Sequence, residues 1–84
     1  MNFMSVSKNT VESLRRSFPA GCRVILEEMN DRHAPPIGTK GTVMHVDDIG
    51  TIHVHWDNGS TLGAIYGEDV VSRVYEDVAV KEKA

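Results

Sequence analysis

The sequence predicts a mainly β protein: a small five-stranded antiparallel barrel with a short N-terminal α-helix in front of it. Turn-forming residues recur at short intervals in the middle of the chain, in the segments 36–43, 47–51 and 56–60. The stretches between them are short and rich in Val, Ile and Thr, as the strands of an antiparallel meander are. A chain of 84 residues has room for one small domain of this kind.

The expected helix lies within the first eighteen residues, where apolar side chains recur at helical spacing. They are Val11, Leu14 and Phe18. Asn9 or Thr10 is expected to be the N-cap, and Pro19 ends the helix because the residue before a proline is pushed out of the helical region. So short a helix is marginal alone, so its apolar stripe must dock on the barrel or on a second copy of the protein.

Five strands are expected, at residues 23–27, 41–46, 51–56, 61–66 and 70–75. The middle strand alternates between an apolar and a polar face, as a sheet with one buried side requires. The apolar face, which we expect in the core, carries Ile52, Val54 and Trp56. The polar face carries Thr51, His53 and His55.

The turn between the second and third strands determines which of their residues face each other. A two-residue turn at positions 48–49 is expected, and it places His45 on the opposite side of the sheet from His53. The facing pairs are then Met44 with His53 and Thr42 with His55.

The remaining turn residues have separate structural roles. The Asn-Gly pair at 58–59 predicts a type I′ turn, and Gly50 suits a left-handed position. Asp47 and Asp57 are expected to accept hydrogen bonds from nearby backbone amides. Gly63, inside an expected strand, predicts a bulge or a sharp bend. Curvature of this kind would close the sheet into a barrel and remove its exposed edges.

Composition limits the class of protein. We expect residues 1–18 to be an N-terminal segment with a short amphipathic helix, 19–75 the barrel and 76–84 a flexible tail. The net charge of −3 argues against a protein that binds phosphate backbones by broad electrostatic attraction. Residues 1–23 are an exception, because they hold four basic side chains and one acidic side chain. One cysteine, Cys22, excludes an internal disulfide and fits a reducing compartment. No targeting or membrane-spanning segment is recognised, so a cytoplasmic location is expected.

Several motifs occur in order between Phe18 and Tyr75: GTKGTV at 38–43, VDDIGTIHV at 46–54, WDNGS at 56–60 and GED at 67–69. Together they closely resemble a family of small bacterial and phage-associated domains of unknown function. The resemblance implies an SH3-like barrel, and its Gly-x-x-Gly-x-Val opening is similar to the start of the KOW module of ribosome and transcription proteins. It implies no activity and leaves the N-terminal helix outside the family's domain.

Candidate catalytic and metal-binding groups are few. His53 and His55 share a strand face and could bind a metal ion if a third ligand came from another strand, but no cysteine or close carboxylate completes the set. The acidic pairs at 27–28, 47–48 and 68–69 are better explained by turns than by catalysis, because neighbouring strand residues point to opposite faces. Cys22 is expected to be a small core thiol. We therefore expect no enzyme and no cofactor.

The leading functional prediction is a non-catalytic module that binds a protein partner through the longest connection, between the first two strands. The residues expected to contact the partner are Asn30, Asp31, Arg32, His33, Pro35, Pro36 and Ile37. The alternative is a nucleic-acid- or ribosome-associated domain that uses Arg15, Arg16 and Arg23. A metal-binding protein built on the histidine face is a remote third hypothesis, and homodimerisation through the helix is an open possibility.

Overall fold

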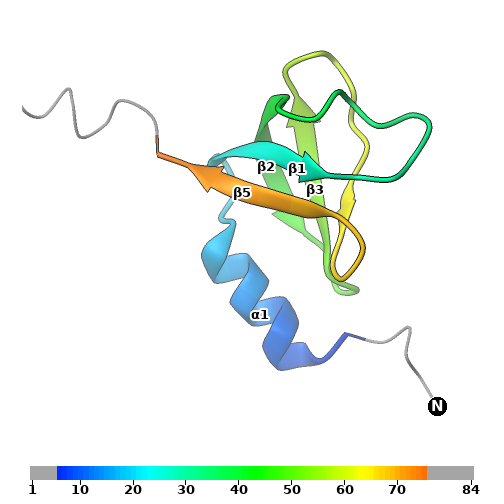
Figure 1. Cartoon of the computed structure of the whole chain (residues 1–84). Helices are drawn as coiled ribbons and strands as arrows, with labels where there is room; N and C mark the ends of the chain where they lie inside the picture. Colours follow the sequence, from blue (N-terminus) through cyan, green and yellow to red (C-terminus); the bar gives the residue numbers. More distant parts are fainter. Residues whose placement is uncertain (1–5, 76–84) are drawn as a thin grey trace, which may run out of the picture.

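The computed structural model describes residues 6–75, which form one helix and a five-stranded antiparallel sheet (Figure 1). The elements are α1 (Lys8–Ser17), β1 (Arg23–Glu28), β2 (Lys40–Val46), β3 (Thr51–Trp56), β4 (Ala64–Ile65) and β5 (Val70–Val74). The mainly β class, the five strands and the short N-terminal helix are confirmed. The expected tail at 76–84 lies outside the described residues.

Helix α1 begins earlier than the sequence predicted. Ser7 is the N-cap: its backbone is extended, and its hydroxyl accepts a hydrogen bond from the Thr10 amide at 3.0 Å. Asn9 and Thr10 therefore lie inside the helix, and the prediction that one of them caps it is wrong. The better cap is the serine because its side chain reaches the third helical amide, the usual geometry at this position.

The apolar stripe of α1 packs on the sheet of its own chain. Val11 is only 4% exposed, and Leu14 and Phe18 pack against the core. At the end of the helix, the Arg73 guanidinium of β5 donates to the Ser17 carbonyl at 3.1 Å. The stripe was expected to dock either on the barrel or on a second copy of the protein, and in the structure it covers the sheet of its own chain. With ten residues, α1 is too short to cross a membrane, and it is the one helix in the part of the chain described here.

The strand order is β4-β3-β2-β1-β5, so β4 and β5 are the two edges of the sheet. No ladder joins these edges within residues 6–75, and the expected closure into a barrel is corrected to an open sheet. The reason is that β4 is much shorter than the strand expected at 61–66. A turn links the edges instead: the amides of Glu68 and Asp69 donate to the Ile65 carbonyl at 3.0 and 2.9 Å.

The segment before β4 bends over the indole of Trp56, which explains why the strand is short. Trp56 is 1% exposed, as expected for a core residue, and its indole N–H donates to the Leu62 carbonyl at 2.8 Å. Gly63 lies against β3, where an added Cβ would come within 2.7 Å of Thr51 Cγ2. Gly63 thus lies just before β4, at a close approach to the neighbouring strand β3.

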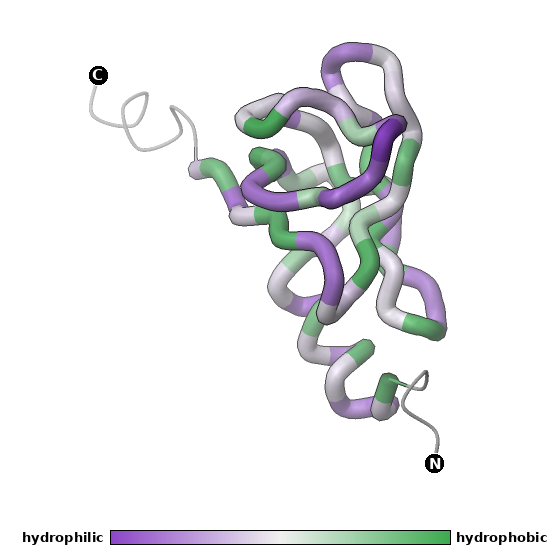
Figure 2. Tube along the Cα trace, turned by 45° about the vertical axis from the view of Figure 1, so that its right-hand side comes forward, coloured by the Kyte–Doolittle hydropathy of each residue, from purple (hydrophilic) through white to green (hydrophobic). Residues whose placement is uncertain are grey.

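The core lies on the face of the sheet turned toward α1. Its fully buried side chains come from β1, β2 and β3: Val24, Leu26, Val43, Val54 and Trp56. In Figure 2 the most hydrophilic stretches of the tube are connecting segments, whereas hydrophobic residues recur along the strands. The predicted burial of alternate β3 residues is confirmed.

The β2–β3 hairpin differs from its predicted register. Thr42 faces His55 as expected, but a bulge follows Val43, so His45 and not Met44 is the partner of His53. The turn has three residues, with the Asp47 amide donating to the Thr51 carbonyl at 3.0 Å and a left-handed glycine at its end. The two-residue turn was wrong because the bulge inserts one extra residue into β2.

The turn after β3 is centred on residues 57–58, one position before the predicted Asn-Gly pair. The Gly59 amide donates to the Trp56 carbonyl at 2.9 Å, and Gly59 has a φ of 96°. Only the last of the three loop residues is a left-handed glycine, which is the three-residue hairpin pattern rather than type I′. Asn58 instead accepts a hydrogen bond from the Ser60 amide at 3.0 Å.

Candidate functional site

The long connection between β1 and β2 is pinned to the body of the protein at both ends. Met29 is 8% exposed and Pro35 is buried. The Gly38 amide donates to the Leu26 carbonyl at 2.8 Å, and the Leu26 amide donates back to Thr39 at 2.9 Å. These contacts give the loop a fixed base on β1, so that its tip is presented from a rigid support.

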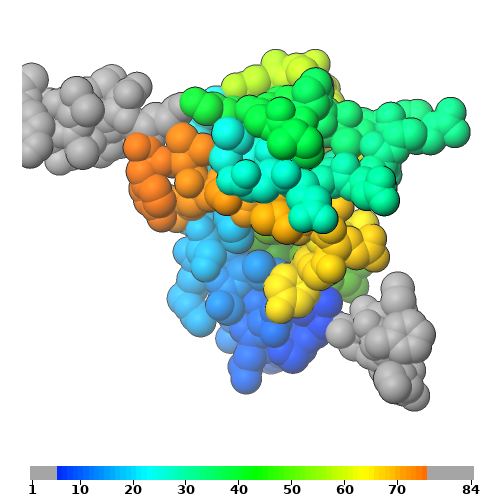
Figure 3. Space-filling view, in the orientation of Figure 1, coloured from blue at the N-terminus to red at the C-terminus, as the bar shows by residue number. Residues whose placement is uncertain are grey.

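The tip of this loop faces solvent. In Figure 3 the segment projects from one side of the molecule. Asp31 organises it, because its carboxylate accepts from the His33 amide at 2.7 Å and its carbonyl accepts from the Ala34 amide at 2.9 Å. The exposed residues of the predicted set are Asn30, Asp31, Arg32, His33, Pro36 and Ile37. Pro35 is the exception, and it positions the loop instead of meeting solvent.

The histidines do not meet as the sequence suggested. His53 stacks on His45, with ring centroids 4.5 Å apart and planes 14° from parallel. Its Nε2 lies 2.8 Å from a carboxylate oxygen of Asp47, while His55 is exposed opposite Thr42. Within residues 6–75, no three His, Cys, Asp or Glu side chains are grouped to hold a metal ion. Among the described residues, His53 therefore contacts His45 and Asp47.

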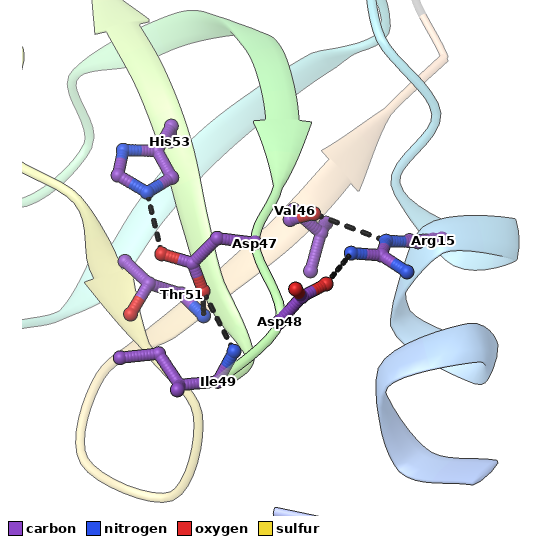
Figure 4. Close-up of polar contacts among 7 residues, drawn as sticks. All are labelled: Arg15, Val46, Asp47, Asp48, Ile49, Thr51 and His53. Atoms are coloured by element: carbon purple, nitrogen blue, oxygen red, sulfur yellow. Dashed lines mark hydrogen bonds and ion pairs between the residues drawn. The ribbon is translucent and has the colours of Figure 1, made fainter. Parts of the chain in front are cut away.

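Asp47 is the polar centre of the β2–β3 turn (Figure 4). One carboxylate oxygen accepts from the amides of Ile49 and Thr51 at 3.1 and 2.9 Å, and the other accepts from His53. Burial raises the pKa of the Asp47 carboxyl, but the hydrogen bonds from His53 and from the two amides outweigh it and hold the pKa below its ordinary value. The predicted amide capping by Asp47 is confirmed.

The next residue of the turn ties the hairpin to the helix. Asp48 accepts from the Arg15 guanidinium at 2.8 Å, and the Nε of Arg15 donates to the Val46 carbonyl at 3.0 Å (Figure 4). Asp48 is almost fully exposed, so the ion pair itself is weak, whereas the bond to the backbone carbonyl is partly buried. Arg15 is therefore occupied in joining α1 to the sheet.

At the other end of the sheet, Arg23 is also paired. Its guanidinium donates two hydrogen bonds to Asp57, at 2.9 and 2.6 Å, and one to the Thr42 hydroxyl at 3.1 Å. The hydrogen bonds from Arg23 lower the pKa of Asp57. Asp57 was expected to cap backbone amides, and its side chain binds this arginine instead. The spacing of 34 residues between the two gives no sequence signal for the pair.

Cys22 lies just before β1 and packs against the core. Burial raises the pKa of its thiol, so that the reactive thiolate is disfavoured. This environment is consistent with the expected core thiol.

A second surface was missed by sequence reasoning. An apolar hollow of about 160 Å³ lies where α1 meets the edges of the sheet. Leu14 of α1 and the helix C-cap Phe18 line one side of it. The other side is lined by Ile65, Tyr66 and Val70, from β4, β5 and the turn between them. The last three side chains are 45–51% exposed. Nothing local in the sequence indicates the hollow, because three separate segments form it.

These features define a small domain with an open antiparallel sheet, one packed helix and a projecting loop, in which the acidic turn residues Asp47, Asp48 and Asp57 serve structure. The chain belongs to the family described as Domain of unknown function (DUF4314), which matches residues 7–74. That match takes in α1, which the resemblance from motifs had left outside. No curated protein and no solved structure matches the chain. The SH3-like and KOW-like resemblance stays a prediction.

Proposed function

We propose that this protein is a non-catalytic interaction module that binds a protein partner through the tip of the β1–β2 loop, residues 30–37. The observation that carries the proposal is the contrast within that loop. Its ends are held by Met29, Pro35 and hydrogen bonds to β1, whereas Arg32, His33 and Ile37 are exposed. A rigidly supported loop loses less conformational entropy on binding than a free one.

The chemistry of the tip suits a protein surface. Ile37 is 59% exposed and offers an apolar anchor, and Arg32 adds a charged, hydrogen-bonding group of a type common at interfaces. His33 also lines an open hollow of about 480 Å³ with His53 and Thr51, so a partner bound at the tip would reach the outer sheet face. We therefore infer that the interface combines the loop tip with the neighbouring hollow.

The test is differential capture by two matched variants of the full chain. Arg32→Ala/His33→Ala/Ile37→Ala removes the proposed contacts. Its control, Arg16→Ala/His55→Ala/Ile49→Ala, removes the same three residue types from exposed positions elsewhere. Proteins that the wild type and the control retain, and the loop variant loses, support the proposal. Equal capture by both variants, with unchanged Trp56 fluorescence, contradicts it.

Nucleic-acid or ribosome association is the second function considered, and the structure offers it less support. Two of the three basic residues that suggested it, Arg15 and Arg23, are paired with Asp48 and Asp57. Arg16 is exposed. A gel shift with single- and double-stranded RNA that weakens as salt is added would favour this function over the first. Light scattering on the intact chain tests the separate proposal of a homodimer.

A further inference from the structure

His45 and His53 form a cross-strand pair on the outer face of the sheet. The bulge in β2 brings them opposite each other, and their rings stack at 4.5 Å. Imidazole is the side chain whose charge changes between about pH 5 and 8. Two stacked imidazoles therefore form a contact whose sign depends on pH: attractive between neutral rings and repulsive between two cations.

The groups around the pair are unequal. Asp47, from the β2–β3 turn, contacts His53 at 2.8 Å, and the two side chains are 31% and 39% exposed. His33, from the β1–β2 loop, lines the same hollow as His53 and would add a further positive charge in acid. On the far side of the turn, Asp48 is already paired with Arg15. One carboxylate thus faces the pair directly and balances only one of its two charges.

We propose that His45, His53 and Asp47 form a proton-operated latch on the β2–β3 hairpin. With one proton or none on the pair, the rings stay stacked and His53 stays bonded to Asp47. When both rings are protonated, two positive charges lie 4.5 Å apart, and His45 leaves the stack while Asp47 retains His53. Acid therefore opens the outer face beside the bulged residue Met44 without breaking the turn that Asp47 caps.

The energetic test is a double-mutant cycle on the full chain, with wild type, His45→Gln, His53→Gln and the double variant unfolded by urea. The coupling between positions 45 and 53 is expected to be neutral or favourable near about pH 7.5 and unfavourable near about pH 5.5. Two unit charges held 4.5 Å apart at the dielectric of water correspond to about fivefold in the folded-to-unfolded ratio. The expected change is smaller than this limit, because His45 leaves the stack and the charges move apart.

Two controls separate the latch from a general histidine effect. A cycle between His53 and His55, which lies two residues along the same strand and faces Thr42, is expected to show little pH dependence. His45→Phe retains a ring but takes no proton, so a cycle between position 45 of that variant and His53 should show no unfavourable coupling at the lower pH. A 45/53 coupling that is equal at both pH values, or matched by the 53/55 cycle, overturns the proposal.

NMR supplies a second, structural measurement. Contacts between the ring protons of His45 and His53 are expected at the higher pH and should disappear at the lower one, while the Ile49 and Thr51 amides bonded to Asp47 keep their protection from exchange. Ring contacts that persist at both pH values overturn the latch. Loss of protection at these two amides in the same pH range also overturns it, because the turn itself would then have opened.

Discussion

The two connections on either side of β2 use similar residues in opposite ways. Both contain at least one aspartate and a left-handed glycine. In the β2–β3 turn, the side chains of Asp47 and Asp48 bind His53, backbone amides and Arg15. In the β1–β2 loop, Asp31 accepts one backbone bond through its side chain. The side chains of the first connection therefore bind groups of the same chain, whereas most side chains at the tip of the second are exposed to solvent.

The difference follows from where each connection lies. The β2–β3 turn sits beside α1, so its polar groups meet partners within the chain, as Figure 4 shows. The β1–β2 loop projects from the body, as Figure 3 shows, and only its base meets the core. Sequence composition alone would class both as polar loops. Each of the following predictions tests whether this division between a structural turn and a presenting loop is real.

The largest effect is expected from a comparison of two glycines, Gly41 inside β2 and Gly38 in the β1–β2 loop. At Gly41 in β2, an added Cβ would come within 2.6 Å of Val54 and 2.8 Å of Trp56, so Gly41→Ala should destabilise the fold by about 1–3 kcal/mol through overpacking. At Gly38, in the loop, an added Cβ meets nothing within 4 Å, and only its φ of 95° resists substitution. Urea unfolding of both variants measures this. A larger cost at Gly38 would contradict the comparison.

The next largest effect is expected for two aspartates, Asp47 in the β2–β3 turn and Asp31 in the β1–β2 loop. Asp47→Ala removes two amide caps and the bond to His53, and we expect it to lower the free energy of unfolding by about 1–2 kcal/mol. Asp31→Ala removes one exposed side-chain bond and should cost less than about 1 kcal/mol. Thermal or urea unfolding of the two variants gives the difference. Equal costs would mean that the two connections are equally structural.

A smaller effect is expected on the acid side of the stability profile. The folded-state pKa of Asp47 lies below its ordinary value, so its contribution is present above the unfolded-state pKa of about 3.9 and is lost as the pH falls through the lowered folded value. Asp47→Asn lacks this charge. The difference in unfolding free energy between wild type and Asp47→Asn, measured with urea, should therefore become smaller as the pH falls from about 3.9 through the lowered folded-state pKa of Asp47. A constant gap would show that the carboxylate charge contributes nothing.

The smallest effect is expected for the exposed ion pair between the hairpin and the helix. Asp48→Ala should change stability by no more than about 0.5–1 kcal/mol, because Asp48 is almost fully exposed and solvent screens the pair. Arg15→Ala should cost more, since Arg15 also binds the Val46 carbonyl. A double-mutant cycle between the two residues separates the two contributions. A large coupling energy between Arg15 and Asp48 would show that this exposed ion pair stabilises the fold more than a solvent-screened contact should.

Much of the fold could be predicted because its signals are local. Alternating residues 51–56 and the helical spacing of Val11, Leu14 and Phe18 each identified an element and its buried face. The bulge at Met44 could not be predicted, because the extra residue is set by how two strands fit together. The loop residues of the candidate site could be named from loop length, but the burial of Pro35 depends on packing.

The sequence by itself determined the class of fold, the helix, the strand faces and the long loop, since periodicity and turn chemistry act between residues close along the chain. Only the tertiary structure decided the open sheet edge, the His45–His53 stack and the pairing of Arg15 and Arg23 with distant aspartates. These features join residues up to 34 positions apart, or depend on a one-residue shift in register, and such contacts form only when the strands and the helix pack together.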